Sequence, residues 1–194
     1  MDKTRSFLAI DFGSFYSEEI KVVVQSLKQH YTDVKWVNPE AMHLTLSFFG
    51  NVEQCLIDTA SDILKTLAPR HQAFSLSLHG VGGFPDLANP RVLWAGLEGQ
   101  TELLQSLKKD LDAGLLKAGI APEERDFRPH LTLGRLRGFK RQARNLPPDV
   151  LNFNSSQSYR VTRLVIFKSE LTREGARYTP LRTFSLLPEV AANP

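Results

Sequence analysis

Two identical four-residue segments hold the residues best suited to chemistry. "HLTL" begins at His43 and again at His130. In a strand, residues i and i+2 project from the same face, so His43 lies beside Thr45 and His130 beside Thr132, while the leucines anchor the opposite face. Each segment therefore presents an imidazole and a hydroxyl to one side. If the two segments belong to related lobes, their polar faces meet across a cleft.

Two histidines and two threonines suit phosphodiester chemistry. An imidazole with a pKa near its usual value of about 6.5 can serve as a base or, when protonated, as an acid. Hydrolysis of a cyclic phosphodiester needs both: one group takes a proton from water and the other gives one to the leaving ribose oxygen. Threonine hydroxyls can hydrogen-bond to the non-bridging phosphate oxygens. One histidine per strand without a carboxylate or cysteine cluster does not suit zinc, so we expect no metal and no cofactor.

The alternative is a duplication that preserves only a packing pattern. In that case the leucines would recur while the exposed polar positions drift. Here the histidine and the threonine recur as well, which favours a functional site.

Other residues have weaker claims on the site. Arg135 is a candidate phosphate ligand, but it follows His130 by five residues, so strand alternation turns it to the opposite face unless a bulge re-aims it. Trp36 could stack on a base, although we expect it in the core. Phe48 and Phe49 are also expected to pack inside.

Charge is distributed unevenly along the chain. Residues 1–97 contain 8 Lys and Arg against 10 Asp and Glu, and residues 98–194 contain 16 against 11. Seven of the basic residues accompany only Asp126 between positions 125 and 144; they are Arg125, Arg128, Arg135, Arg137, Lys140, Arg141 and Arg144. This density favours a phosphate-bearing partner, although a solvated loop would look the same.

The remaining composition is that of a globular protein. It is 42% hydrophobic and 23% charged, with apolar runs far shorter than a membrane span and no signal-peptide pattern. We therefore expect a cytoplasmic monomer that does not bind membranes.

Strand and helix patterns alternate along the chain. Apolar residues recur with helical spacing over about 20–27, 56–67 and 101–118, and these segments separate stretches with strand character. The segments "AFSLSLHGV" and "RVLWAGLE" predict a strand pair, and "SYRVTRLVIFKSEL" with "ARYTPLRTFSLL" predicts a hairpin. These patterns predict a single α+β domain over residues 1–194. We expect two pseudo-symmetric lobes, each an antiparallel sheet flanked by helices, with the boundary around 84–100 and the cleft between them.

With these residues in view, the chain resembles the 2H phosphoesterase superfamily, named for paired His-x-Thr/Ser motifs. It is most similar to the RNA 2′,3′-cyclic phosphodiesterases, also called 2′-5′ RNA ligases. "VKWVNPEAMHLTLSFFGNV", "RVLWAGL", "FRPHLTLGRL" and "KSELTREGARYTPL" resemble family segments in the expected order.

The resemblance implies hydrolysis of RNA 2′,3′-cyclic phosphate ends to 2′-phosphates without metal or nucleotide cofactor. It assigns proton donation to His43, proton acceptance to His130 and phosphate binding to Thr45 and Thr132; spacing alone cannot assign these roles. Reversible, ATP-independent 2′-5′ joining of RNA ends is a secondary activity that it also implies.

Two alternatives remain at this point. One is an RNA-end-binding module without turnover. The other is a related 2H activity on another cyclic phosphate, including a small cyclic nucleotide, or on a 2′-5′ oligonucleotide.

Overall fold

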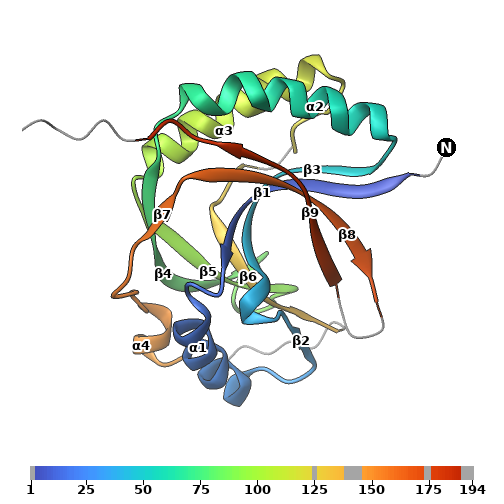
Figure 1. Cartoon of the computed structure of the whole chain (residues 1–194). Coiled ribbons are helices and arrows are strands. Elements are labelled where there is room, and N and C mark those ends of the chain that lie inside the picture. Colours follow the sequence, from blue (N-terminus) through green and yellow to red (C-terminus); the bar gives the residue numbers. More distant parts are fainter. Residues whose placement is uncertain (1–2, 124–125, 138–145, 173–175, 189–194) are drawn as a thin grey trace, which may run out of the picture.

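Two antiparallel sheets with helices at both ends make up the structure (Figure 1). The computed structural model describes residues 3–123, 126–137, 146–172 and 176–188. Within these ranges the first sheet has the strand order β3-β1-β8-β9 and the second has the order β2-β6-β5-β4-β7. The strands are β1 (Thr4–Gly13), β2 (Val34–Trp36), β3 (Met42–Val52), β4 (Phe74–Phe84), β5 (Val92–Gly99), β6 (His130–Leu136), β7 (Tyr159–Val161), β8 (Arg163–Leu171) and β9 (Ala176–Ser185).

The helices lie where the apolar periodicity predicts them. They are α1 (Ser17–His30), α2 (Gln54–Leu67), α3 (Thr101–Lys117) and the short α4 (Pro148–Leu151), with 3₁₀ turns at η1 (Pro39–Ala41) and η2 (Ala68–Arg70). α2 and α3 run side by side at one end of the molecule, and α1 and α4 lie at the other (Figure 1). In α3 the buried side chains are four leucines at successive turns, Leu104, Leu107, Leu111 and Leu115, as expected for a helix with one apolar face.

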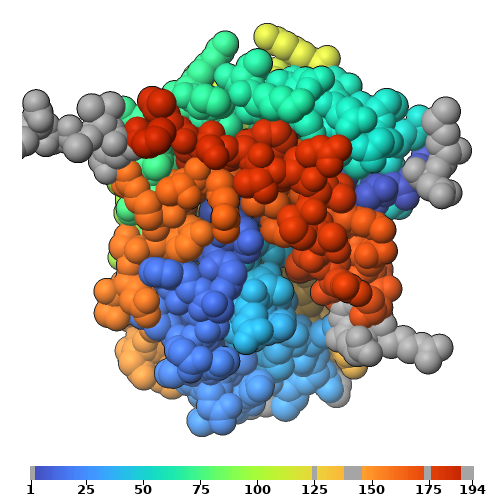
Figure 2. All heavy atoms as spheres, viewed as in Figure 1, coloured from blue at the N-terminus to red at the C-terminus, as the bar shows by residue number. Residues whose placement is uncertain are grey.

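The fold is α+β, as the sequence predicts, but the two sheets exchange strands. β2 and β4 end at or before residue 84 and belong to the second sheet, whereas β8 and β9 come from the C-terminal part and complete the first. The boundary expected around residues 84–100 therefore does not separate the sheets. In Figure 2 the C-terminal segments, in orange and red, cross the middle of the visible face, below the green and teal segment and above the blue N-terminal segments. Both halves of the chain thus build each wall of the cleft.

The strand expected over "SYRVTRLVIFKSEL" is divided between the two sheets. β7 pairs with β4 in the second sheet, whereas β8 pairs with β1 and β9 in the first. The division falls at Thr162, where the chain passes between sheets. The expected β8–β9 and β4–β5 pairs are both present.

Alternation along β1 separates a core face from a cleft face. Leu8 and Ile10 are fully buried in the main core, which also takes in residues of α1, α2 and α3. Phe7 and Ala9 point the other way and pack with Val165 and Phe167 in a small separate cluster. Phe7 of this second cluster also lines the cavity that holds His43, so the cluster forms an apolar part of the cleft wall.

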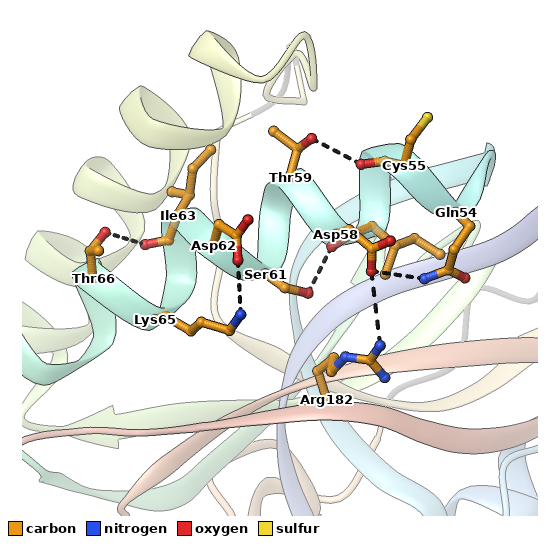
Figure 3. Close-up of polar contacts among 11 residues, drawn as sticks. Gln54, Cys55, Asp58, Thr59, Ser61, Asp62, Ile63, Lys65, Thr66 and Arg182 are labelled. Carbon is orange, nitrogen blue, oxygen red and sulfur yellow. Dashed lines mark hydrogen bonds and ion pairs between the residues drawn. The ribbon is translucent and has the colours of Figure 1, made fainter.

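Polar contacts hold the outer face of α2 (Figure 3). Gln54 donates to Asp58 over 3.0 Å, and Lys65 pairs with Asp62 over 2.8 Å. Arg182 reaches from β9 to within 3.8 Å of Asp58. Such exposed pairs contribute little stability, so this face is a solvated surface away from the cleft. Among the described residues, no helix is long and apolar enough to cross a membrane.

Candidate active site

The two "HLTL" segments lie close together although they belong to different sheets. His43 and Thr45 stand on β3, His130 and Thr132 stand on β6, and these two strands contact each other where the sheets meet. The order of the elements explains this proximity. β2 pairs with β6 in the second sheet, and the chain then crosses through η1 directly into β3 of the first.

Two cavities open on either side of this meeting point. The His43 cavity, of about 580 Å³, contains His43 and Thr45 in its lining; the His130 cavity, of about 960 Å³, contains His130. Thr132, Arg135 and Phe48 line both. The two cavities therefore form one cleft, with one histidine on each side of a shared centre.

Both imidazoles are held in the same way. His43 Nδ1 lies 3.1 Å from the carbonyl oxygen of Ala41, and His130 Nδ1 lies 2.7 Å from that of Arg128. A carbonyl oxygen only accepts, so Nδ1 carries the proton in each ring. In the neutral ring Nε2 is then the lone-pair nitrogen, free to accept a proton or, after protonation, to donate one.

Aromatic rings pack against each histidine. His43 has Phe7 at 4.9 Å and Tyr178 edge-on at 4.8 Å between ring centroids. His130 has Phe84 edge-on at 4.9 Å and Trp94 at 6.1 Å. These contacts and the carbonyl bonds restrict rotation of both imidazoles.

The surroundings favour neutral histidines. Burial lowers the pKa of His43 below its ordinary value, and the charges of Arg135 and His130 act in the same direction, against the Ala41 carbonyl bond and the Asp11 carboxylate. Burial also lowers the pKa of His130, again with help from Arg135. At pH 7 both rings are therefore mainly neutral in the free protein, and an anionic phosphate between them would favour protonation.

A β-bulge follows each His-x-Thr pair at the same position. Opposite β1, Ala9 pairs with Thr45 and Leu8 with Ser47, so Leu46 has no partner. Opposite β5, Trp94 pairs with Thr132 and Leu93 with Gly134, so Leu133 has no partner. Both unpaired residues are the last leucine of "HLTL". An extra residue reverses the alternation, so side chains beyond the bulge change faces.

This reversal is the bulge that re-aims Arg135, and it corrects the packing prediction for Phe48. Arg135 lines the cleft with His130 instead of facing away from it. Phe48, expected in the core, is 48% exposed and lines both cavities, whereas Phe49 is buried as expected. Trp36 packs against the main core, also as expected.

The basic segment after residue 124 is only partly described. Arg128 lines the His130 cavity beside Arg135 and with Arg91, while Arg137 is not part of either lining. Arg125, Lys140, Arg141 and Arg144 lie outside the described residues.

Tyr178 was not among the predicted site residues. It reaches the His43 cavity from β9, where it pairs with Ser169. Burial raises the pKa of its phenol, while Arg135 and Arg5 lower it. The pattern "ARYTPL" indicates a strand but does not say which cavity the tyrosine reaches, because that depends on β9 joining the N-terminal sheet.

No group of three or more His, Cys, Asp or Glu side chains that could hold a metal ion occurs in the part of the chain that the structure describes. Arg135 is a positive charge that acts on both histidines and lines both cavities, which suits an anionic ligand.

Two sheets that each contribute one His-x-Thr pair to a shared cleft define a 2H phosphoesterase. Within that class the chain belongs to the 2′-5′ RNA ligase superfamily, whose profile matches residues 16–173.

Relatives of known name match over almost the whole chain. The RNA 2′,3′-cyclic phosphodiesterase of Methanothermobacter thermautotrophicus is 33% identical over 95% of this chain and 100% of its own. That of Archaeoglobus fulgidus is 33% identical over 93% and 99%. Among solved structures, Escherichia coli LigT complexed with 3′-AMP is 28% identical over 95% of this chain and 99% of that one, with a TM-score of 0.76.

Proposed function

We propose that this protein is an RNA 2′,3′-cyclic phosphodiesterase that produces 2′-phosphate ends by paired histidine catalysis. The observation that carries the proposal is the matched hydrogen bonding of the two histidines. Each Nδ1 is committed to the carbonyl two residues earlier, which leaves each Nε2 for proton transfer on its own side of one cleft. The names of the relatives support the same reaction.

In the proposed reaction the cyclic phosphate lies between the histidines. Nε2 of His130 takes a proton from water as the water oxygen bonds to phosphorus. The bond from phosphorus to O3′ breaks, and Nε2–H of His43 gives its proton to O3′. Water attacks opposite the departing oxygen, which suits one proton carrier on each side. The assignment of donor and acceptor follows the family resemblance.

The remaining side chains stabilise charge on the phosphate. The hydroxyls of Thr45 and Thr132 donate to the non-bridging oxygens, and Arg135 supplies a positive charge that reaches both cavities. These groups are fixed before substrate binds, because both strands are anchored by buried leucines on the other face.

Ligation is a second reaction of the same cleft. There an RNA 5′-hydroxyl takes the place of water, on the side of the proton acceptor. The His130 cavity is the larger of the two and offers Arg91 and Arg128 beside His130, so it has space and charge for a nucleotide. RNA joining requires that second end to be bound and aligned, which makes hydrolysis the main activity.

The test uses EDTA-treated protein and a short RNA ending in a 2′,3′-cyclic phosphate. Wild type, His43→Ala and His130→Ala are compared, and the product is identified as a 2′- or 3′-phosphate. We expect a 2′-phosphate from the wild type alone, with all three proteins folded.

Several results would contradict the proposal. RNA binding without product would favour an RNA-end-binding module, whereas turnover only of another cyclic phosphate or a 2′-5′ oligonucleotide would favour a related 2H activity. Near-normal turnover by either variant would exclude the two-histidine mechanism. Loss of activity with EDTA and its recovery on adding a metal would do the same. Adding an RNA with a 5′-hydroxyl end to the same reaction tests ligation.

A further inference from the structure

Phe127 stands shortly before His130, at a point of the chain that belongs to neither a helix nor a strand. Its side chain packs against the main core, and Nζ of Lys108 on α3 lies 5.3 Å from the centre of its ring. An ammonium group over an aromatic ring is attracted by the negative face of the ring. Phe127 is therefore fastened to α3 as well as to the core.

Lys108 is held in place for this contact by a second partner. Its side chain is only 12% exposed, which is unusual for lysine, and Nζ is ion-paired with Asp112 on the next turn of α3. A largely buried ammonium needs partners that replace water. The carboxylate and the ring of Phe127 together supply them, so the position of Lys108 is well defined.

Only two residues separate Phe127 from the histidine, and both are restricted in conformation. Arg128 precedes a proline, which favours extended backbone, and the ring of Pro129 fixes its own φ. The carbonyl oxygen of Arg128 lies 2.7 Å from His130 Nδ1 and places the proton of that ring on Nδ1. A shift of Phe127 would therefore displace the acceptor of this hydrogen bond.

The other histidine is held by a local turn. The carbonyl oxygen of Ala41 lies 3.1 Å from His43 Nδ1, and the N–H of Ala41 donates to the Asn38 carbonyl over 3.0 Å at the end of η1. The Asn38 side chain also accepts from the Glu40 N–H over 3.1 Å. The acceptor for His43 is thus fixed within its own turn, whereas the acceptor for His130 follows a residue that is fastened to α3.

We propose that Phe127, held by Lys108, is a positioning residue that keeps the Arg128 carbonyl in place and thereby fixes the tautomer of His130. The inference rests on the proposed function, in which Nε2 of His130 takes a proton from water and must therefore carry none beforehand. A neutral imidazole released from the carbonyl can carry its proton on either nitrogen. Every molecule with that proton on Nε2 would lack the base.

The experiment observes the tautomers directly, by long-range ¹H–¹⁵N correlation NMR of ¹⁵N-histidine-labelled protein at about pH 8, where the rings are neutral. Wild type is compared with Lys108→Met, Phe127→Leu and Phe127→Tyr, and circular dichroism checks the folding of each. Phe127→Leu removes the ring but leaves the Lys108–Asp112 pair, so it tests the inference even if Lys108→Met does not fold. Lys65→Met is the matched control, because Lys65 on α2 is 64% exposed and pairs with Asp62. The same proteins are assayed for kcat and KM on a short RNA ending in a 2′,3′-cyclic phosphate.

We expect His130 to become a mixture of the two tautomers in Lys108→Met and Phe127→Leu, while His43 keeps its proton on Nδ1. In both variants kcat should fall about tenfold and KM should stay within about twofold, because the base is misplaced and the proposed phosphate ligands are not. Phe127→Tyr keeps a ring face for Lys108 and should restore the wild-type spectrum and rate. Lys65→Met should match wild type in both measurements.

Three results would overturn the inference: an unchanged His130 tautomer in Phe127→Leu, equal changes at His130 and His43, or a tyrosine variant that behaves like the leucine variant. A lower kcat with an unchanged His130 tautomer belongs to the first of these, since it would mean that Phe127 only supports the fold. If wild type does not hydrolyse the RNA, the proposed function is contradicted instead, and the spectra still decide whether Phe127 fixes the tautomer.

Discussion

Replacing Arg135 by glutamine should change both the rate and its pH dependence. The guanidinium lines both cavities, and its charge lowers the pKa of both catalytic histidine candidates, His43 and His130. A hydrogen bond to a charged group contributes about 1.5–3 kcal/mol, so loss of the proposed contact between Arg135 and the phosphate should lower kcat/KM roughly ten- to a hundredfold.

The direction of the pH change follows from the sign of the charge. Removal of a cation makes protonation of a nearby imidazole easier, so the pKa of each histidine rises. Both limbs of the bell-shaped pH profile of kcat/KM, which reports the free enzyme, should move to higher pH in Arg135→Gln.

Arg135→Lys separates the two effects. Lysine keeps the charge but loses the planar fork that fits a phosphate, so the rate should fall while the limbs stay near their wild-type positions. The assay is initial-rate hydrolysis of a cyclic nucleotide between about pH 4.5 and 9, a range that brackets the ordinary histidine pKa. The control is Arg182→Gln, an exposed arginine on β9 that contacts Asp58 on α2 (Figure 3). If the two limbs of the pH profile stay in place or move to lower pH in Arg135→Gln, the electrostatic reasoning is refuted.

Three further predictions concern the proposed phosphate ligands, the core and acid stability. Thr45→Val and Thr132→Val keep the side-chain shape but remove a hydroxyl that can donate to the phosphate. Each should lower kcat/KM about tenfold or more, while the Tm measured by circular dichroism changes little. Normal kinetics in either variant would exclude that threonine as a phosphate ligand. The Tyr16 hydroxyl, whose pKa burial raises to about 12, donates to a backbone carbonyl and accepts from a backbone N–H, so Tyr16→Phe should reduce the free energy of unfolding in urea by about 1–3 kcal/mol; an unchanged urea midpoint would contradict this. The pKa of His43 and of His130 is lower in the folded protein than in the unfolded chain, so the unfolded chain binds more protons as the pH falls. The contribution of the two histidines to stability is therefore present above about pH 6.5 and is lost on acidification. The Tm of the double variant His43→Gln/His130→Gln should fall less than that of wild type on acidification, and equal falls would count against buried neutral histidines.

The sequence by itself determined the elements and the chemical type of the site. Helices α1, α2 and α3 lie where apolar residues recur at helical spacing, because a helix buries one face whatever its neighbours are. The pairing of His43 with Thr45 and of His130 with Thr132 also follows from local geometry, since strand alternation is a property of the backbone. The repeat of these polar positions was sufficient to indicate phosphate chemistry.

Only the tertiary structure decided how these residues combine. Local alternation turns Arg135 away from the cleft unless a bulge re-aims it, and packing preference places Phe48 in the core. The bulge is present and Arg135 lines the cleft, whereas the prediction for Phe48 was wrong. Both outcomes depend on bulges at Leu133 and Leu46, which arise from pairing with partner strands distant in sequence. Tyr178 reaches His43 because β9 joins the N-terminal sheet through β8, an arrangement that depends on long-range strand order. The lowered histidine pKa values have the same origin, since burial is a property of the assembled sheets and not of the four-residue motif.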